Sequence, residues 1–250
     1  MLTEKRYEAI LRMVDQNRTV TVQELTEKLG ISESTARRDL TALDSMGRLH
    51  KVFGGATANT GSYTTRDLSM REKRQLHSEE KQRIARYAAS LIREDDFIYL
   101  DAGTTTQLIT EYLTQTQCVF VTNSLAHASA LCSRGCRTIL TGGELKRVTE
   151  ALVGSETIHA LSRYNFTLGF FGTNGVDDIH GFTTPDPEEA MVKTAAMERC
   201  RRRIVVCDSG KFGQVAPVTF ASFSDAEIIT DRKPAQGYES YTNIKEVDIS

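Results

Sequence analysis

The ten residues from Ile31 to Leu40, Ile-Ser-Glu-Ser-Thr-Ala-Arg-Arg-Asp-Leu, combine hydroxyl groups with two adjacent arginines. Ser32 is a favourable N-cap because its hydroxyl accepts a hydrogen bond from a free backbone N–H of the first helical turn. At about 100° per residue, Ala36, Leu40 and Leu43 then form one apolar stripe. The hydroxyls and arginines lie on the opposite face and its flanks. Such a helix is suited to the DNA major groove, where arginine pairs with guanine. An ordinary solvated surface helix is the alternative.

The residues expected to contact DNA lie on this helix and on a short hairpin after it. Residues 48–56 are too few and too β-branched for another helix, so they predict a small β wing whose basic side chains contact phosphate or the minor groove. His50 on this wing is equally well explained as a plain surface histidine. The expected DNA contacts are Ser32, Ser34, Thr35, Arg37, Arg38, Thr41, Arg48 and Lys51.

A second set of polar residues follows buried, strand-like runs in the later part of the chain. Five runs end in Gly, Thr, Asn, Ser or Asp, at residues 101–106, 122–124, 141–143, 172–175 and 208–211. Ordinary turn chemistry explains any one of these loops. Because ligands bind outside the carboxyl ends of parallel strands, their convergence on one edge predicts a site for a small polar, anionic ligand.

The loops suggest a role for each side chain in that site. Residues 103–106 open a helix, so their free N–H groups, hydroxyls and helix dipole favour a phosphate, and Lys211 adds a positive charge. Asp101 would repel phosphate and is expected to accept from sugar hydroxyls. The full set of expected effector contacts is Asp101, Gly103, Thr104, Thr105, Thr106, Asn123, Asn174, Gly175 and Lys211. The loops match neither a P-loop nor G-x-G-x-x-G, so no nucleotide cofactor is indicated.

The elements that position the first set form a helix-turn-helix. Residues 3–17 have apolar side chains at helical spacing. Thr21 and Glu24 form a capping box that opens a second helix, and Gly30 ends it as a left-handed C-cap. The third helix begins after Ser32. Two helices joined by a Gly-containing turn and followed by a hairpin predict a winged helix-turn-helix over residues 1–58.

The elements that position the second set alternate between strands and helices. Strands are expected at 97–100, 119–121, 138–140, 168–171 and 204–207, with helices at 80–92, 104–113 and 185–199. This alternation predicts an α/β domain over residues 79–250 with a mainly parallel sheet covered on both faces. Residues 59–78 have few apolar side chains and are expected to be a linker. Arg66, Arg71, Lys73 and Arg74 in it are solvated or contact the DNA backbone.

Composition bounds the class of protein. The 250 residues are 40% hydrophobic and 26% charged, as in soluble globular proteins, and no apolar run approaches the roughly 20 residues of a membrane span. The first 86 residues carry 16 Lys and Arg against 12 Asp and Glu, whereas the rest carry 15 against 21. A basic front on an acidic body suits a nucleic-acid module attached to another domain. No C-x-x-C pair occurs, so the five cysteines are expected to be buried free thiols in a cytoplasmic protein without metal or cofactor.

Two groups of motifs extend along the chain. The first half contains V-x-E-L, I-S-x-S-T-A-R-R-D-L-x-x-L and G-R-L-x-K-V-x-G-G-A. The second half contains L-D-A-G-T-T-T, V-T-N-S, T-G-G-E-L, G-T-N-G-V, G-F-T-T-P-D-P-E-E-A-x-V-K and D-S-G-K-F. Together they resemble the DeoR/GlpR family of bacterial transcription regulators over nearly the whole chain. Phe53 departs from the family pattern, which commonly has histidine before Gly-Gly-Ala. The T-P-D-x-x-E-A run and the start L-T-E-K-R-Y are most similar to fructose-operon repressors.

The resemblance implies a winged helix-turn-helix that binds operator DNA and an effector domain that senses phosphorylated sugars or polyols. It implies that the effector domain is similar in fold to ribose-5-phosphate isomerase and coenzyme A transferases. Fructose-operon repressors respond to fructose 1-phosphate, so we expect a repressor of a sugar-utilisation operon that this ester releases. No residue excludes an activator. A homo-oligomer, dimer or tetramer, is expected because one DNA-binding domain makes too few contacts for tight specific binding.

A sugar-phosphate isomerase carrying a DNA-binding domain is the main alternative. Isomerisation needs a general base and groups that stabilise an enediolate. Isomerases of the similar fold carry D-G-A-D-E followed by a lysine, whereas residues 172–177 here are Gly-Thr-Asn-Gly-Val-Asp, with neutral groups in place of the first carboxylate. Glu189 and Lys193 keep a spacing that on a helix is also an ordinary i, i+4 salt bridge. We therefore expect a pocket that binds without turnover, and no enzyme.

Overall fold

The computed structural model describes residues 3–17, 19–46, 48–57, 62–63, 68–234, 237–238 and 240–247. The chain divides into two compact units, Met1–Ser62 and Tyr63–Ser250, and the short strand β4 (Ser62–Tyr63) spans the division. The boundary expected between residues 58 and 59 lies outside the described residues, as does Arg66.

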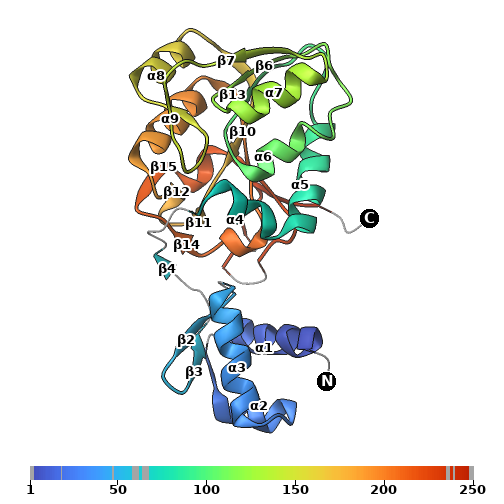
Figure 1. Ribbon diagram of the computed structural model, residues 1–250, viewed down its shortest axis with the longest axis vertical. Coiled ribbons are helices and arrows are strands. Elements are labelled where there is room, and N and C mark those ends of the chain that lie inside the picture. Colours follow the sequence, from blue (N-terminus) through green and yellow to red (C-terminus); the bar gives the residue numbers. More distant parts are fainter. Residues whose placement is uncertain are drawn as a thin grey trace. The chain divides into compact units, whose positions relative to one another are not determined.

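The first unit is a winged helix-turn-helix (Figure 1). Its elements are α1 (Thr3–Asn17), β1 (Thr19–Thr21), α2 (Val22–Leu29), α3 (Glu33–Ser45), β2 (His50–Val52) and β3 (Gly55–Thr57). The strands form an antiparallel sheet in the order β1-β3-β2. Thr21 and Glu24 form the expected capping box, and Gly30, with φ of 62°, caps α2 in the left-handed conformation that a residue without Cβ adopts at no steric cost. Both expected helix boundaries are confirmed.

The core of the first unit fixes the orientation of α3. Ala36, Leu40 and Leu43, the expected stripe, are fully buried. Asp39 is buried on the same side of α3 and forms an ion pair with Arg6 of α1, in which Nη2 of Arg6 donates to Oδ1 of Asp39 over 3.0 Å. This pair joins α1 to α3, so the opposite face of α3 stays exposed.

A seven-stranded parallel sheet forms the second unit, which confirms the expected sheet. Its order is β17-β16-β13-β10-β5-β6-β7, and all six pairings are parallel. The strands are β5 (Phe97–Leu100), β6 (Val119–Thr122), β7 (Arg137–Leu140), β10 (Phe166–Gly172), β13 (Cys200–Val206), β16 (Glu227–Thr230) and β17 (Ile244–Glu246).

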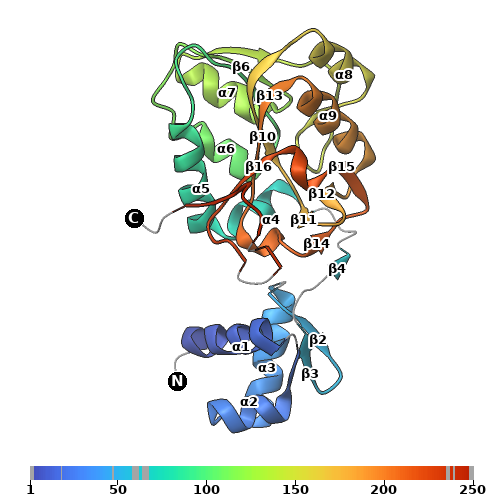
Figure 2. The same cartoon turned by 180° about the vertical axis from the view of Figure 1, so that it is seen from behind.

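Helices cover both faces of this sheet (Figures 1 and 2). On one side lie α5 (Ser78–Ser90), α6 (Thr104–Ile109) and α7 (Leu125–Ser133), and on the other lie α8 (Ser155–Ser162) and α9 (Pro187–Glu198). Because successive strand residues point to opposite faces, Ile98 and Leu100 pack under the first group and Tyr99 under the second. α6 ends at Ile109, four residues short of its expected end.

Shorter elements surround the main sheet. They are α4 (Met70–Gln75), β8 (Glu144–Leu145), β9 (Leu152–Val153), β11 (Gly175–Asp177), β12 (Gly181–Thr184), β14 (Gln214–Val215), β15 (Val218–Ala221) and the 3₁₀ turns η1 (Ser209–Lys211) and η2 (Phe223–Asp225). In the described residues, no helix has the length and apolar character needed to cross a membrane.

Two expectations about local structure are wrong. The expected linker contains α4, because Ser69 and Glu72 form a capping box that starts a helix. The five cysteines are free thiols, but Cys132 is exposed because it lies on the outer side of α7 rather than against the sheet. The other four, Cys118, Cys136, Cys200 and Cys207, are buried as expected.

Candidate functional site

The exposed face of α3 carries the residues expected to contact DNA. Ser32 caps the helix by accepting from the Thr35 backbone N–H over 3.2 Å, and its hydroxyl also contacts those of Ser34 and Thr35 at 3.0 and 2.9 Å. Arg37 and Arg38 are exposed on the following turn. Glu33 accepts from Arg37 over 3.3 Å. Three hydroxyls and two guanidinium groups therefore lie together at the N-terminal end of α3.

Lys51, one of the expected DNA contacts, joins the wing to α3. Lys51 Nζ donates to the Thr41 hydroxyl over 2.7 Å, and the Lys51 backbone N–H donates to Asp44 over 2.8 Å. Arg48 is exposed, and His50 Nδ1 lies 3.7 Å from Asp44. Of the eight expected DNA contacts, seven side chains are exposed and Thr35 is half-buried. The structure thus brings all eight onto α3 and the wing.

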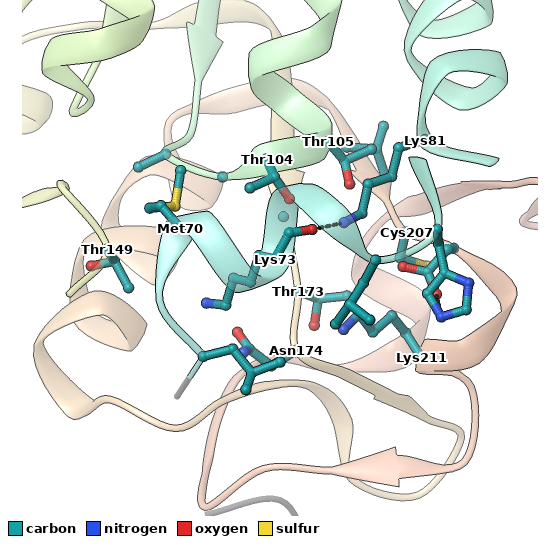
Figure 3. A pocket seen from close by; sticks show the side chains of 18 of the residues that line it. Met70, Lys73, Lys81, Thr104, Thr105, Thr149, Thr173, Asn174, Cys207 and Lys211 are labelled. Carbon is teal, nitrogen blue, oxygen red and sulfur yellow. Dashed lines mark hydrogen bonds and ion pairs between the residues drawn. The ribbon is translucent and has the colours of Figure 1, made fainter. Parts of the chain in front are cut away.

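A pocket opens in the second unit where three adjacent strands end. Its walls come from the loops after β5, β10 and β13, from α4, α5 and α9, and from Thr149 (Figure 3). Four lysines line it together with threonine hydroxyls, two carboxylates and one histidine. They are Lys73, Lys81, Lys193, Lys211, Thr104, Thr105, Thr149, Thr173, Glu189, Asp208 and His77.

Lys81 of α5 is the most buried lysine that faces this pocket without a carboxylate in contact. Its ammonium donates to the Lys73 backbone carbonyl at the end of α4 (Figure 3). Burial lowers the pKa of Lys81 to about 8, while the nearby Asp208 carboxylate acts in the opposite direction. An anion placed beside Lys81 would favour its charged form. The chemistry of the buried ammonium therefore suits an anion in the pocket.

Lys211 supplies the expected second charge. It lies in η1 after β13, on the same side of the pocket as Lys81 (Figure 3). In the described part of the chain its ammonium has no hydrogen-bond or ion-pair partner. Asp208, three residues earlier, caps η1 by accepting from Gly210 over 3.1 Å and lies 3.9 Å from His77 Nε2. Lys81 and Lys211 together form what we call the cationic end of the pocket.

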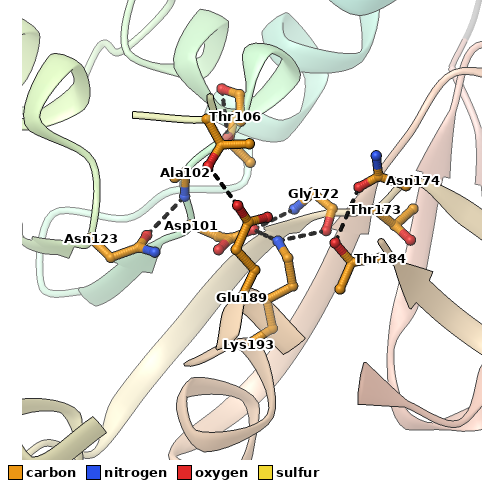
Figure 4. A network of polar contacts seen from close by, with 12 residues as sticks. Asp101, Ala102, Thr106, Asn123, Gly172, Thr173, Asn174, Thr184, Glu189 and Lys193 are labelled. Carbon is orange, nitrogen blue, oxygen red and sulfur yellow. Dashed lines mark hydrogen bonds and ion pairs between the residues drawn. The ribbon is translucent and has the colours of Figure 1, made fainter. Parts of the chain in front are cut away.

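A buried ion pair holds together the elements that form the pocket wall. Lys193 of α9 contacts the carboxylate of Asp101 and donates to the Gly172 carbonyl over 3.1 Å (Figure 4). Asp101 also accepts from the Gly172 backbone N–H over 3.0 Å. Burial raises the pKa of Asp101, and the Lys193 ammonium opposes that shift. The pair joins the ends of β5 and β10 to α9.

Five of the nine expected effector contacts line the pocket, namely Gly103, Thr104, Thr105, Asn174 and Lys211. The other four are held inside the protein and do not line it. Asp101 pairs with Lys193, Thr106 donates to the Gly103 carbonyl over 3.0 Å, and Asn123 accepts from the Ala102 N–H over 2.9 Å. Gly175 pairs within β11, where a Cβ would lie 2.2 Å from the Gln214 carbonyl oxygen. These four position the loops.

Strand order explains why only part of the expected edge forms the pocket. The loops after β5, β10 and β13 line it, and these strands are adjacent in the sheet. β6 and β7 lie farther along the same side, so the loops at 122–124 and 141–143 do not reach it. The salt bridge that the Glu189–Lys193 spacing would allow does not form, because Lys193 pairs with Asp101 and Glu189 accepts from the Thr149 hydroxyl.

The sequence reasoning missed several residues of the pocket. Lys81 is one helical turn from Ile84 and Ala85 on the buried side of α5, and a lysine on an apolar stripe was a usable signal. Lys73 was assigned to a tether, whereas it lines the pocket from α4. Thr149 gave no signal, because no regular element surrounds it in sequence. Among the described residues, no cluster of three His, Cys, Asp or Glu side chains suits a metal ion.

The enclosed cavity is small. Its volume is about 70 Å³, well below the roughly 300 Å³ at the lower end of small-molecule pockets. The strand ends are fixed by the sheet and by the Asp101–Lys193 pair, whereas α4 has only six residues. α4 is shorter than α5 and α9, which also line the pocket.

Comparison with known proteins supports the division into two functional parts. Residues 6–62 match the DeoR-like helix-turn-helix domain, and residues 76–232 match the DeoR C terminal sensor domain. The regulator FruR of Bacillus subtilis, described as uncharacterized, is 38% identical over 96% of both chains. The repressor GlcR of the same species is 34% identical over 95% of this chain and 92% of its own. The lactose phosphotransferase system repressor of Streptococcus mutans is 33% identical over 92% of this chain and 93% of its own.

Solved structures give a more distant similarity. Ribose 5-phosphate isomerase A from Neisseria gonorrhoeae has a TM-score of 0.40 at 12% identity, covering 53% of this chain and 52% of its own. The β subunit of eIF2B from Chaetomium thermophilum has a TM-score of 0.41 at 18% identity, covering 56% of this chain and 41% of its own. The chain thus spans about half of the isomerase and about two fifths of the eIF2B subunit, and similarity at this level supports no conclusion about activity.

Proposed function

Because the chain belongs to the DeoR family of helix-turn-helix transcriptional regulators, we propose that it represses a sugar-utilisation operon and leaves its operator when a phosphorylated sugar binds the sensor domain. Two of the relatives are named as repressors, GlcR and the lactose phosphotransferase system repressor. The protein acts in the cytoplasm as a homo-oligomer, because operator half-sites require paired DNA-binding domains. It senses its ligand and does not convert it.

The observation that carries this proposal is the lysine-lined pocket in a chain whose other unit is a winged helix-turn-helix. Lys81 and Lys211 offer two ammonium groups on one side of the pocket, which suits a phosphate ester that is mostly dianionic at neutral pH. Hydroxyl and amide groups of Thr104, Thr105 and Asn174 suit the hydroxyls of a sugar. Fructose 1-phosphate is the first ester to test, on the resemblance to fructose-operon repressors.

Binding at the pocket would reach the DNA-binding domain through α4. This helix is the first regular element after β4 and it borders the pocket, so a ligand in the pocket would act on it directly. Ser32, Ser34, Thr35, Arg37 and Arg38 engage the operator, with Thr41, Arg48 and Lys51 on its flanks. A coupling of roughly 1–3 kcal/mol would weaken operator binding about 5- to 150-fold, enough for induction.

The test combines a thermal-shift screen with a gel shift. Fructose 1-phosphate should raise the melting temperature of the full chain and release a duplex from the promoter of its own or a neighbouring operon, whereas fructose should do neither. A chain that no sugar phosphate stabilises would contradict the proposal. Interconversion of ribose 5-phosphate or a fructose phosphate would favour the isomerase alternative.

Two variants connect release to the pocket. Lys211→Ala and Thr105→Ala remove a charge and a hydroxyl from its wall and should leave operator affinity unchanged while abolishing release by the sugar phosphate. Arg202→Ala is a matched control, because Arg202 is a cation of the same domain that pairs with Glu227 and does not line the pocket. If both pocket variants still respond like the wild type, the effector site lies elsewhere.

A further inference from the structure

One acidic side chain that lines the lysine-lined pocket has a carboxylate oxygen without a hydrogen bond among the described residues. Glu189 of α9 is 8% exposed. Its Oε1 accepts from the Thr149 hydroxyl over 2.5 Å and lies 3.7 Å from Lys146 Nζ. In the described part of the chain, Oε2 has no hydrogen-bond partner, although it is not sealed from the pocket. A carboxylate this buried normally has both oxygens satisfied.

The ammonium groups nearest to Glu189 form closer ion pairs with other carboxylates. Lys146 forms a closer ion pair with Asp186, the N-cap of α9. Lys193, one helical turn after Glu189, is paired with Asp101 (Figure 4). Thr149 and the longer contact with Lys146 both involve Oε1 of Glu189, so Oε2 is left to accept from a group that enters the pocket.

Glu189 also lies away from the cationic end. Thr149, to which it is hydrogen-bonded, stands on the opposite side of the pocket from Lys81 and Lys211, and Lys73 stands between them (Figure 3). The pocket is thus polarised, with a carboxylate end formed by Glu189 and Thr149. A ligand that spans it meets Lys81 and Lys211, with the Asp208 carboxylate nearby, at one end and an acceptor-only group at the other.

We propose that Glu189 determines specificity by accepting hydroxyl hydrogen bonds from the sugar end of the ligand and excluding a second anionic group there. The pocket accordingly takes sugars or polyols with one phosphate and rejects sugar bisphosphates and phosphorylated sugar acids. Discrimination of this kind depends on the unpaired like charge that the wrong ligand meets. This inference rests on the proposed function and narrows its ligand class.

The test measures binding to the full chain by isothermal titration calorimetry with fructose 1-phosphate, fructose 1,6-bisphosphate and inorganic phosphate. Glu189→Gln removes the charge while keeping an acceptor for Thr149. Glu188→Gln removes the neighbouring, exposed charge of the same helix and is the matched control. Glu189→Gln should reduce the preference for monophosphate over bisphosphate at least about tenfold, a change of about 1.4 kcal/mol. Glu188→Gln should leave it unchanged.

Inorganic phosphate separates specificity from a merely structural role. It fits the cationic end alone, so its affinity should change less than about threefold in Glu189→Gln, whereas a collapsed pocket would lose it. Should Glu189→Gln fail to fold, Glu189→Asp keeps the charge and must retain the monophosphate preference of the wild type.

Two results would overturn the inference while leaving the proposed function in place. One is wild-type binding of the bisphosphate as tightly as the monophosphate, and the other is an equal effect of Glu188→Gln and Glu189→Gln on the ratio. If neither ester nor inorganic phosphate binds the wild-type chain, the proposed function fails and the inference fails with it.

Discussion

The two units present their cations in opposite ways. Arg37 and Arg38 are adjacent in sequence and exposed on one helix, whereas Lys81 and Lys193 are buried and come from different helices. An exposed arginine stays hydrated in the free protein, so its charge lowers the free energy of unfolding very little. Its water is displaced only when DNA binds. A buried lysine is costly unless a carbonyl, a carboxylate or a ligand compensates its charge. The first arrangement suits a large polyanion and the second a small one.

Each unit also contains a buried ion pair that holds its functional element. Arg6 and Asp39 join α1 to α3, and Asp101 and Lys193 join the strand ends to α9. In both pairs the aspartate lies beside residues expected to bind a ligand, yet its carboxylate is used to join two elements of the fold. Variants that remove one partner test whether the two units depend on their pairs independently.

The largest effect is expected for Asp101→Ala, which leaves the Lys193 ammonium buried without a carboxylate. Breaking such a pair costs about 3–5 kcal/mol of the free energy of unfolding. Urea unfolding of the full chain, with hydrogen exchange to assign the transition, should show the loss in the sensor domain alone. Asp39→Ala is the counterpart and should destabilise only the DNA-binding domain. A loss shared by both units in either variant would contradict their independence.

Arg38→Ala should reduce operator affinity by roughly 1–3 kcal/mol and relax base preference at one position, because an arginine on the exposed face of α3 can pair with guanine. Melting temperature and the response to sugar phosphate should not change. Gel shifts over a salt series measure the effect, with Arg202→Ala as a control. Unchanged affinity would show that α3 does not read the operator.

A smaller, pH-dependent effect is expected at Lys81, whose pKa is about 8 in the folded protein. Asp208 favours its charged form, whereas Lys211 and Lys73 disfavour it and Glu80 adds a weak favourable contribution. Raising the pH from 7 to 9 deprotonates Lys81 while a phosphate ester stays dianionic, so affinity for the ester should fall several-fold. Isothermal titration calorimetry at pH 7 and at pH 9 measures this change in affinity. Lys81→Met should bind weakly and lose this dependence.

The same pKa predicts how stability changes with pH. The pKa of Lys81 is lower in the folded than in the unfolded chain, so between about 8 and the ordinary value of 10.5 the unfolded chain binds more protons. The contribution of Lys81 to stability therefore rises with pH across that window. Lys81→Met should remove this rise, and a wild-type curve that falls there in step with the variant would contradict the assignment.

The smallest effect is expected for Glu33→Ala. Its ion pair with Arg37 is exposed, at 3.3 Å, and such pairs contribute less than about 0.5 kcal/mol to stability. Releasing Arg37 should leave operator affinity unchanged or slightly higher, as measured by gel shift. A clear loss of affinity would indicate that Glu33 positions Arg37 for DNA.

Much of the DNA-binding unit was predictable because its signals are local. The Ser32 cap, the Gly30 turn and the stripe of Ala36, Leu40 and Leu43 depend on residues within one or two turns, and the structure has all three. The buried Asp39 was not predicted. It occupies a position on the apolar side of α3, and its partner Arg6 is 33 residues away.

The pocket was predicted only in outline. The strand-end rule located the edge of the sheet where the pocket lies and five of the residues that line the pocket, among them Thr105 and Lys211. It could not separate lining residues from supporting ones, because Asp101 and Lys193 meet only when α9 packs on the sheet. It also included the loops after β6 and β7, since sequence order alone does not give strand order.

The sequence by itself determined the two-part organisation, the recognition-type helix and the parallel sheet, because periodicity, caps and turns act over a few residues. Tertiary structure alone decided that Lys73, Lys81, Lys193 and Lys211 share one pocket and that Glu189 faces them. These residues are brought together by the strand order β13-β10-β5 and by helices packed from both sides. Because these side chains are buried, little water screens their charges, and their electrostatic interactions with neighbouring groups are stronger than at the surface.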